Sequence, residues 1–216
     1  MSSFQTSPRG FRPQLTRLGL AVFGLGLALL VFSPAVRAAA VGEEPQDAGR
    51  VVGNPKAPIT VVEYASMTCP HCAEFSTKVM PKFKAEWVDT GKAKWIFRDY
   101  PLDGAALKAA VVIRCAPADR FYNFVAAFFT NQANWARASD PTVSLTRLAK
   151  LGGLGEERIK ACFSSKKLED AVLQQQLDGK NRFGVNSTPT IYINGNQSKG
   201  FSRWEEFEAE LKSAAK

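Results

Sequence analysis

The chain has 216 residues, a formal net charge of +8 at pH 7 and 45% hydrophobic residues. This composition is typical of a globular protein, and without a long basic run it gives no support to nucleic-acid binding. Four cysteines and a single histidine are the residue types that most restrict the function.

The first 40 residues have the composition of a secretory signal peptide. Three arginines precede an apolar run over residues 18–32, and small residues follow at positions 35–40. A basic region, a hydrophobic region and a small-residue cleavage region are the parts of such a signal. The apolar run is shorter than the roughly 20 residues that span a bilayer, so cleavage is favoured over a retained membrane anchor, which stays the alternative. In both cases we expect the folded part outside the cytoplasm, where disulfides persist.

Removal of residues 1–40 leaves a mildly basic chain. That segment holds four of the 28 basic residues and none of the 20 acidic ones, so 24 basic and 20 acidic side chains remain. Residues 41–50 are polar and contain glycine and proline, which predicts a flexible leader. The remaining length suits one domain with an insertion.

A strand–helix–strand pattern follows the leader. Residues 50–52 indicate a short edge strand, and the apolar run 59–64 predicts a buried strand. Helical spacing over residues 73–87 contains Pro81, which is expected to kink or interrupt the helix. Residues 94–98 predict a second buried strand, so these elements form one βαβ unit.

The motif Cys69-Pro70-His71-Cys72 lies between the first buried strand and the helix. This position places Cys69 in the first helical turn, where unpaired N–H groups and the helix dipole favour a thiolate. Pro70 suits that turn because its missing N–H would have no partner there. These four residues are the candidate catalytic residues, and thiol–disulfide exchange is the favoured chemistry.

Zinc binding and two inert thiols are the alternatives for this motif. A zinc site needs two further cysteine or histidine ligands at suitable spacing. The other cysteines, Cys115 and Cys162, form no second close pair, and His71 is the only histidine. Zinc is therefore disfavoured.

Residues 103–183 are predicted to form a block of helices. Helical spacing of apolar residues occurs in five segments, at 105–116, 121–132, 143–151, 156–164 and 167–183. The aromatic residues of the second segment are expected to pack the core of this block rather than bind a ligand; they are Phe121, Phe124, Phe128 and Phe129.

The chain ends with a strand–strand–helix pattern. Residues 191–193 are apolar, and Asn194-Gly195 after them predicts a hairpin turn. Residues 197–200 are the expected second strand, and residues 202–212 have the spacing of a final helix.

The chain resembles the thioredoxin superfamily and, within it, the DsbA-like disulfide oxidoreductases. The resemblance rests on the thiol motif at a helix start, on Thr188-Pro189 before a strand, and on the helical block between two halves. It implies an α/β fold class, a thioredoxin fold of βαβ…ββα order with an inserted helical domain. Residues 51–102 would form the first half, 103–183 the insertion and 184–216 the second half.

The resemblance also implies roles for individual residues. Cys69 would be the nucleophile that joins a substrate in a mixed disulfide, and Cys72 the more buried partner that closes the redox-active disulfide. His71 is expected to help hold the Cys69 thiolate through a hydrogen bond or a positive charge. Pro189 is expected to follow a cis peptide bond and, with Thr188, to bind the substrate backbone.

Two further pairs have roles that stay open. Glu63 and Lys94 lie in the two predicted central strands, at positions that resemble a buried acid and base beneath the thiols. If buried they would form a proton relay, and a solvent-facing position is equally open. In an oxidising compartment Cys115 and Cys162 are expected to form a structural disulfide, a second bond that some DsbA-like proteins carry. Two free thiols are the alternative.

The implied function is that of a periplasmic dithiol oxidase, which passes the Cys69–Cys72 disulfide to reduced secreted proteins. We expect a monomer without a cofactor, reoxidised by a membrane partner of the DsbB type. An isomerase or reductase kept reduced by a separate donor is the first alternative. A metal-binding or holdase module is the second.

Overall fold

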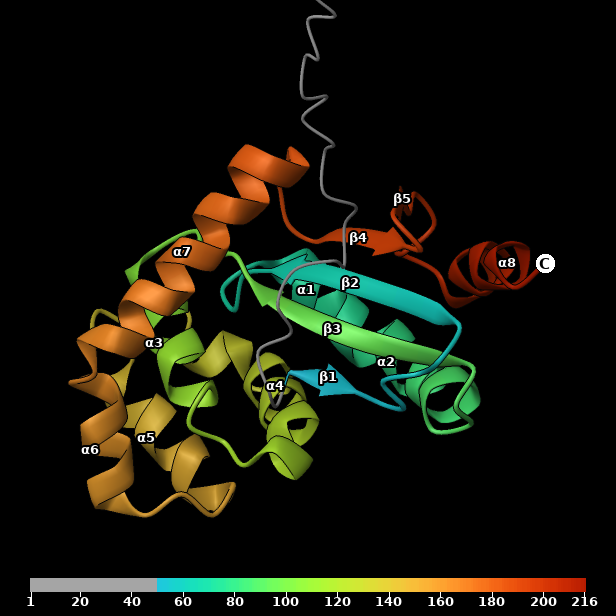
Figure 1. The fold of residues 1–216 in the computed structure, drawn as a ribbon. Helices are drawn as coiled ribbons and strands as arrows, with labels where there is room; N and C mark the ends of the chain where they lie inside the picture. The colour runs from blue at the N-terminus through green and yellow to red at the C-terminus, as the bar shows by residue number, and fades with distance from the viewer. Residues whose placement is uncertain (1–49) are drawn as a thin grey trace, which may run out of the picture. The chain divides into compact units, whose positions relative to one another are not determined.

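The computed structural model of the protein describes residues 50–216 (Figure 1). The predicted signal peptide, and the predicted leader up to residue 49, lie outside the described residues. Within the described range one mixed sheet has the strand order β1-β3-β2-β4-β5. Its strands are β1 (Val51–Val52), β2 (Ile59–Ala65), β3 (Ala93–Asp99), β4 (Thr190–Ile193) and β5 (Asn196–Gln197).

The two central strands are parallel and are buried on both faces. Apart from Thr60 and Lys94, every residue of β2 and β3 is buried, which explains their near-continuous apolar sequence. The register pairs Glu63 with Phe97, while β1 and β4 run antiparallel to the central pair. The strands predicted at residues 50–52, 59–64, 94–98 and 191–193 are therefore confirmed.

The helix that follows the thiol motif alternates between α turns and π turns. Its segments are α1 (Pro70–Glu74), η1 (Phe75–Val79), α2 (Met80–Phe83) and η2 (Lys84–Val88). Pro81 lies at the start of α2, directly after the first π turn. Because proline lacks an N–H and clashes with the preceding turn, the regular α-helix is interrupted there as expected.

Five helices form the predicted insertion and group together beside the sheet (Figure 1). They are α3 (Gly104–Ile113), α4 (Phe121–Thr130), α5 (Thr142–Leu151), α6 (Glu156–Phe163) and α7 (Lys166–Phe183). Two short 3₁₀ turns flank α4, η3 (Ala118–Arg120) and η4 (Gln132–Asn134). The helix α7 ends at Gly184, whose φ of 67° is left-handed and favours glycine.

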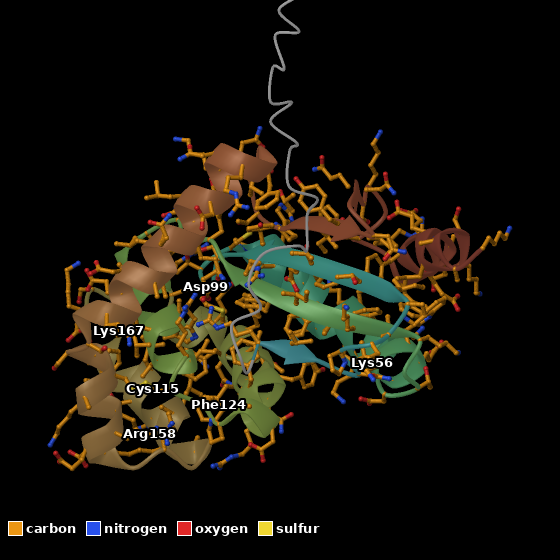
Figure 2. The ribbon with its side chains drawn as sticks, in the orientation of Figure 1. Lys56, Asp99, Cys115, Phe124, Arg158 and Lys167 are labelled. Atoms are coloured by element: carbon orange, nitrogen blue, oxygen red, sulfur yellow. A yellow bond between two sulfur atoms is a disulfide. The ribbon has the colours of Figure 1, made fainter. Side chains whose placement is uncertain are left out.

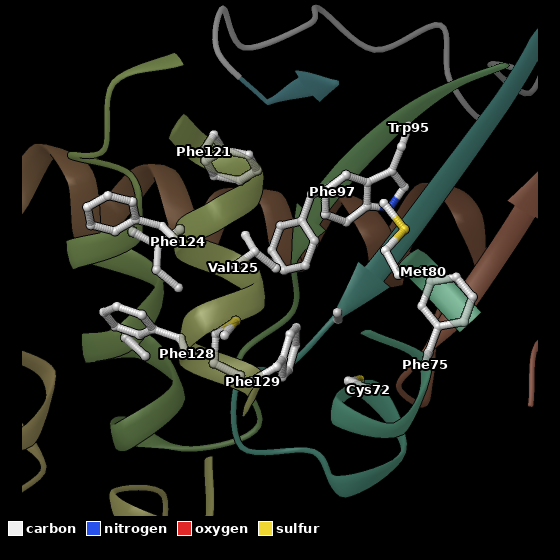
Figure 3. Close-up of a cluster of buried hydrophobic side chains, with 14 of the residues drawn as sticks. Cys72, Phe75, Met80, Trp95, Phe97, Phe121, Phe124, Val125, Phe128 and Phe129 are labelled. Atoms are coloured by element: carbon white, nitrogen blue, oxygen red, sulfur yellow. The ribbon is translucent and has the colours of Figure 1, made fainter. Parts of the chain in front are cut away.

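An aromatic core joins the insertion to the sheet (Figure 3). The four phenylalanines predicted to pack this core are buried: Phe121, Phe124, Phe128 and Phe129. The ring centroids of Phe97 on β3 and Phe121 on α4 are 5.9 Å apart. Burial of each such side chain contributes about 1.5–3 kcal/mol, so the insertion and the sheet stabilise one another.

Cys115 and Cys162 form a disulfide with a Cα–Cα distance of 6.4 Å. Cys115 follows α3, and Cys162 lies in α6 (Figure 2). The predicted pairing is therefore confirmed, and the bond ties the first helix of the insertion to the fourth.

Asp99, the last residue of β3, is the centre of a buried polar cluster (Figure 2). Its Oδ2 accepts hydrogen bonds from Arg50 Nη1 at 3.2 Å and from Arg114 Nε at 2.8 Å. The amide oxygen of Gln175 on α7 accepts from the Asp99 N–H at 2.6 Å. The cluster thus connects β3 with α7 and with Arg50, just before β1.

The chain ends with a hairpin and the helix α8 (Trp204–Ala214). Asn194 and Gly195 connect β4 to β5 and have φ values of 48° and 84°, as an Asn-Gly hairpin turn requires. Among the helices in residues 50–216, none has both the length and the apolar character that crossing a bilayer demands.

Candidate active site

Cys69 occupies the N-cap position of α1, at the positive end of a helix. It follows β2 through a short loop in which the Cys69 N–H donates to the Ser66 carbonyl at 3.0 Å. Pro70 is the first residue of the helix, and Cys72 is fully buried one turn inside it. The predicted position of the nucleophile at a helix start is therefore correct.

The environment lowers the pKa of Cys69 from 9.0 to about 5. The hydrogen bond from the Cys72 thiol is the largest cause, and burial opposes it. The Thr188 side chain and the backbone N–H groups of Cys72 and His71 lower the pKa further. At neutral pH Cys69 is therefore a thiolate, the form that attacks disulfides.

Cys72 has the opposite tendency, because its pKa is raised well above 9.0. Burial is the largest cause, and the hydrogen bond to Cys69 and the negative charges of Cys69 and Glu63 add to it. The two sulfurs of one motif are thus strongly unequal. At neutral pH Cys69 is a thiolate, and Cys72 is a thiol that keeps its proton.

Thr188 lies beside the nucleophile although it is 119 residues away along the chain. The Cys69 sulfur lies 3.2 Å from the Thr188 carbonyl oxygen, to which it donates a hydrogen bond when it is protonated. The Thr188–Pro189 peptide bond is cis, as the resemblance implied. The predicted role of both residues in substrate binding remains a prediction.

The His71 side chain does not have the position expected for it. Its ring is 75% exposed, and Nδ1 lies 3.2 Å from Oε2 of Glu74. That contact is the largest cause of the lowered pKa of Glu74. The His71 backbone N–H, and not the imidazole, is among the groups that lower the pKa of Cys69.

Glu63 is buried in the centre of β2 and is 1% exposed. Oε2 accepts a hydrogen bond from Trp95 Nε1 at 2.9 Å, while Oε1 has no hydrogen-bond partner among residues 50–216. Burial raises its pKa to about 8, the Trp95 hydrogen bond lowers it, and the Cys69 charge raises it. Of the buried and solvent-facing positions that were open for Glu63, the structure therefore shows the buried one.

Of the two positions left open for Lys94, the structure does not show the buried one. Lys94 is only partly buried, and its Nζ donates to the Pro55 carbonyl at 2.8 Å. The register of Glu63 with Phe97 puts Trp95 and Phe97 on the face of the acid, and strand alternation then places Lys94 on the other face. Trp95 is the residue that sequence reasoning missed.

Two side chains of the insertion form hydrogen bonds with residues 66–69, the loop between β2 and α1 that we call the thiol loop. The Thr68 hydroxyl donates to Asp103 Oδ2 at 2.7 Å, just before α3. The amide nitrogen of Gln132 donates to the carbonyl of Met67 at 2.8 Å and to that of Cys69 at 3.0 Å. Nothing in the sequence pattern singled out Gln132, because it lies more than 60 residues from the loop.

Comparisons with known proteins agree with this geometry. A family model described as thioredoxin matches residues 46–213. The putative protein-disulfide oxidoreductase of Rickettsia felis is 30% identical over 79% of this chain. This chain spans only 62% of the length of that relative.

This chain covers a larger share of the length of two other similar proteins. Disulfide bond formation protein D of Bacillus subtilis is 30% identical, over 82% of each chain. The crystal structure of Wolbachia pipientis alpha-DsbA1 superposes with a TM-score of 0.72 at 33% identity, over 77% of this chain and 90% of the other.

Proposed function

Because the chain belongs to the thioredoxin family, in its DsbA-like branch, we propose that it is a periplasmic dithiol oxidase that transfers the Cys69–Cys72 disulfide to secreted proteins. The observation that carries the proposal is the unequal pair of sulfurs. The pKa of Cys69 is lowered to about 5, and that of Cys72 is raised well above 9.0.

The reaction begins when a substrate thiolate attacks the Cys69 sulfur of the oxidised protein. The Cys69–Cys72 bond breaks, a Cys69–substrate bond forms, and the Cys72 sulfur leaves with the electron pair and takes up a proton. A second substrate thiolate then attacks the substrate sulfur of this mixed disulfide. Cys69 leaves as a thiolate, and the substrate dithiol has lost two electrons to the protein.

A low thiol pKa favours oxidation of the substrate for two reasons. A thiolate of low basicity is a good leaving group, which accelerates the second step. Stabilisation of the Cys69 thiolate also stabilises the reduced protein relative to the disulfide form, which raises the reduction potential. A protein with these properties gives its disulfide away readily.

Glu63 is the proposed proton donor to Cys72. Its raised pKa keeps the carboxyl protonated at neutral pH, and its charge in the ionised form acts on Cys72. The departing Cys72 sulfur needs a proton because burial disfavours its charge. Proton return to Glu63 would accompany reoxidation.

Thr188 and Pro189 are proposed to bind the substrate backbone next to Cys69. The contact between the Cys69 sulfur and the Thr188 carbonyl supports this assignment, because a peptide joined to Cys69 must lie beside that loop. Extended substrate backbone would then lie along the loop that carries Thr188 and Pro189.

The proposed compartment and partners rest on the signal-like first 40 residues and on the family. Newly secreted proteins with reduced cysteines are the proposed substrates. A membrane reoxidant of the DsbB type would restore the disulfide, and the protein would act as a monomer.

The equilibrium of the purified protein with glutathione tests the oxidase assignment. We expect a potential well above the roughly −270 mV of thioredoxin, and near the roughly −120 mV of the strongest oxidants of this fold. A potential as low as that of thioredoxin would identify a reductase and overturn the proposal. Refolding of a substrate with scrambled disulfides distinguishes an isomerase from an oxidase, because an isomerase rearranges these disulfides without net oxidation.

A Cys69→Ser variant separates the oxidase from a binding module. The serine variant should lose disulfide transfer completely, since its hydroxyl forms no mixed disulfide. A holdase that binds unfolded chains through its surface would keep its activity. Retained activity would therefore contradict the proposed function.

A further inference from the structure

Gln132 joins the helical insertion to the backbone of the nucleophile. Its Nε2 donates one hydrogen bond to the Met67 carbonyl at 2.8 Å and one to the Cys69 carbonyl at 3.0 Å. These two bonds use both hydrogens of the amide group. The contact bridges 65 and 63 residues of sequence, respectively.

The segment that carries Gln132 is firmly anchored in the insertion. Gln132 begins the 3₁₀ turn η4, and its carbonyl accepts hydrogen bonds from the N–H groups of Trp135 and Ala136. Trp135 is fully buried, and its Nε1 donates to the Phe128 carbonyl at 3.0 Å. The amide of Gln132 therefore projects from a packed support, and its position is set by the core of the insertion.

The geometry at Cys69 depends on the loop that Gln132 holds. The Cys69 carbonyl accepts from Ala73 N–H at 3.2 Å in the first helical turn and from Gln132 in addition. The Cys69 sulfur must be within reach of the N–H groups of that turn and also of Thr188. A small rotation of the Cys69 backbone would move the sulfur out of reach of one or the other.

Gln132 also acts on the charge next to the sulfur. The carbonyl oxygens of Met67 and Cys69 carry partial negative charge close to the nucleophile. The two amide hydrogens of Gln132 carry partial positive charge and lie against those oxygens. In a partly buried site such fixed dipoles act more strongly than in water, so they favour an anion nearby.

We propose that Gln132 is a positioning residue through which the helical insertion holds Cys69 in the geometry that stabilises its thiolate. This role rests on the proposed function of Cys69 as the nucleophile. Gln132 touches neither sulfur in the observed contacts and acts only through the loop backbone.

The test compares Gln132→Met with the unaltered protein. Methionine has nearly the same length as glutamine but donates no hydrogen bond. Gln176→Met is the matched control, because Gln176 Nε2 donates to the Pro101 carbonyl at 2.7 Å and does not contact the thiol loop. The readouts are the ultraviolet absorbance of the thiolate against pH and the equilibrium with glutathione.

In Gln132→Met we expect the thiolate midpoint to rise by about 0.5–1 pH unit, the effect of one or two lost hydrogen bonds. The glutathione equilibrium should shift about three- to tenfold toward the oxidised protein. Gln176→Met should leave both values unchanged. Gln132→Glu offers a second variant of the same size, in which an ionised carboxylate repels the two carbonyls and shifts the midpoint in the same direction.

A purely structural role gives a different result. Gln132→Met and Gln132→Glu would then destabilise the oxidised and reduced forms equally and leave the thiolate midpoint in place, which would overturn this inference alone. An ordinary thiol midpoint of about 8.5 in the unaltered protein would overturn the proposed function and this inference together.

Discussion

Trp95 Nε1 donates a 2.9 Å hydrogen bond to Oε2 of Glu63 across the two central strands. The buried acid of this protein is therefore paired with a neutral donor, while Lys94 lies on the other face of the sheet. Burial raises the pKa of the Glu63 carboxyl to about 8, and the Trp95 hydrogen bond offsets this rise only in part. Glu63 can thus hold a proton at neutral pH, as its proposed role as proton donor to Cys72 requires.

The Cys69 thiolate should make the stability of the reduced protein depend on pH. Its folded pKa of about 5 lies below the ordinary value of 9.0. The stabilisation is therefore complete above pH 9, decreases as pH falls from 9 to 5, and is absent below 5. Chemical unfolding at a series of pH values measures the unfolding free energy of the reduced and of the oxidised form. The difference between the two free energies should change by up to about 1.4 kcal/mol per pH unit.

Cys69→Ser is the control for that titration, because its hydroxyl does not ionise in this range. This variant cannot form the Cys69–Cys72 disulfide, so it is compared with the unaltered reduced protein, and it should lack the part of the pH dependence between 5 and 9 that Cys69 contributes. If the difference in unfolding free energy between the reduced and oxidised forms of the unaltered protein does not depend on pH, Cys69 is an ordinary thiol.

Glu63→Gln should remove a pH dependence of opposite sign. The folded pKa of Glu63 is about 8 against 4.5 in the unfolded chain, so the folded state binds the extra proton between these values. The contribution of Glu63 to the stability should therefore decrease as pH rises from 4.5 to 8, and it is measured on the disulfide form, in which Cys69 does not titrate. The glutamine variant should lack this loss, and denaturant unfolding across the range measures it.

The same variant should slow disulfide transfer. Glutamine has no proton to give to Cys72, so the rate at which the mixed disulfide forms should fall about 10²-fold, as for the loss of a general acid. Stopped-flow mixing with a reduced peptide measures this rate. An unchanged rate would show that water protonates Cys72 instead.

Trp95→Phe should raise the pKa of Glu63 further. The variant removes the one hydrogen bond to Oε2 and keeps most of the aromatic packing against Phe97, whose ring centroid lies 5.4 Å away. Loss of one hydrogen bond corresponds to about 0.7 pH unit. The carboxyl carbon resonance of Glu63 in an NMR titration measures the shift, and Trp204→Phe on α8 serves as the control that leaves it unchanged.

Removal of the second disulfide should destabilise the protein without removing its redox motif. Cys115 and Cys162 are 47 residues apart, and closing a loop of this length contributes about 4 kcal/mol by the chain-entropy relation. The double alanine variant should lose about that much unfolding free energy, measured with Cys69 and Cys72 reduced in both proteins. A loss below about 1 kcal/mol would show that the bond is dispensable for the fold.

Asp99→Asn should cost far more stability than the loss of a surface ion pair. The change leaves Arg50 and Arg114 buried without their carboxylate, and breaking such a pair costs about 3–5 kcal/mol. Glu157→Gln removes the exposed contact with Lys160 and should cost at most about 1 kcal/mol. Equal losses in urea unfolding would contradict the importance of the buried cluster.

The sequence by itself determined the local elements and the identity of the thiol motif. Helices such as α4 and strands such as β2 follow from the spacing of apolar residues within a few turns. Cys69 was placed at a helix start because proline, the preceding strand and the following helical pattern are all close in sequence. Such features depend on neighbours along the chain, which the sequence contains completely.

Only the tertiary structure decided which side chains meet. Strand alternation turns each residue to the face opposite its neighbour, so a register known to within one residue cannot choose between Lys94 and Trp95 as the partner of Glu63. Gln132 reaches Cys69 because the core of the insertion sets where its turn lies. These contacts join residues that are distant in sequence, and their geometry results from the packing of the whole domain.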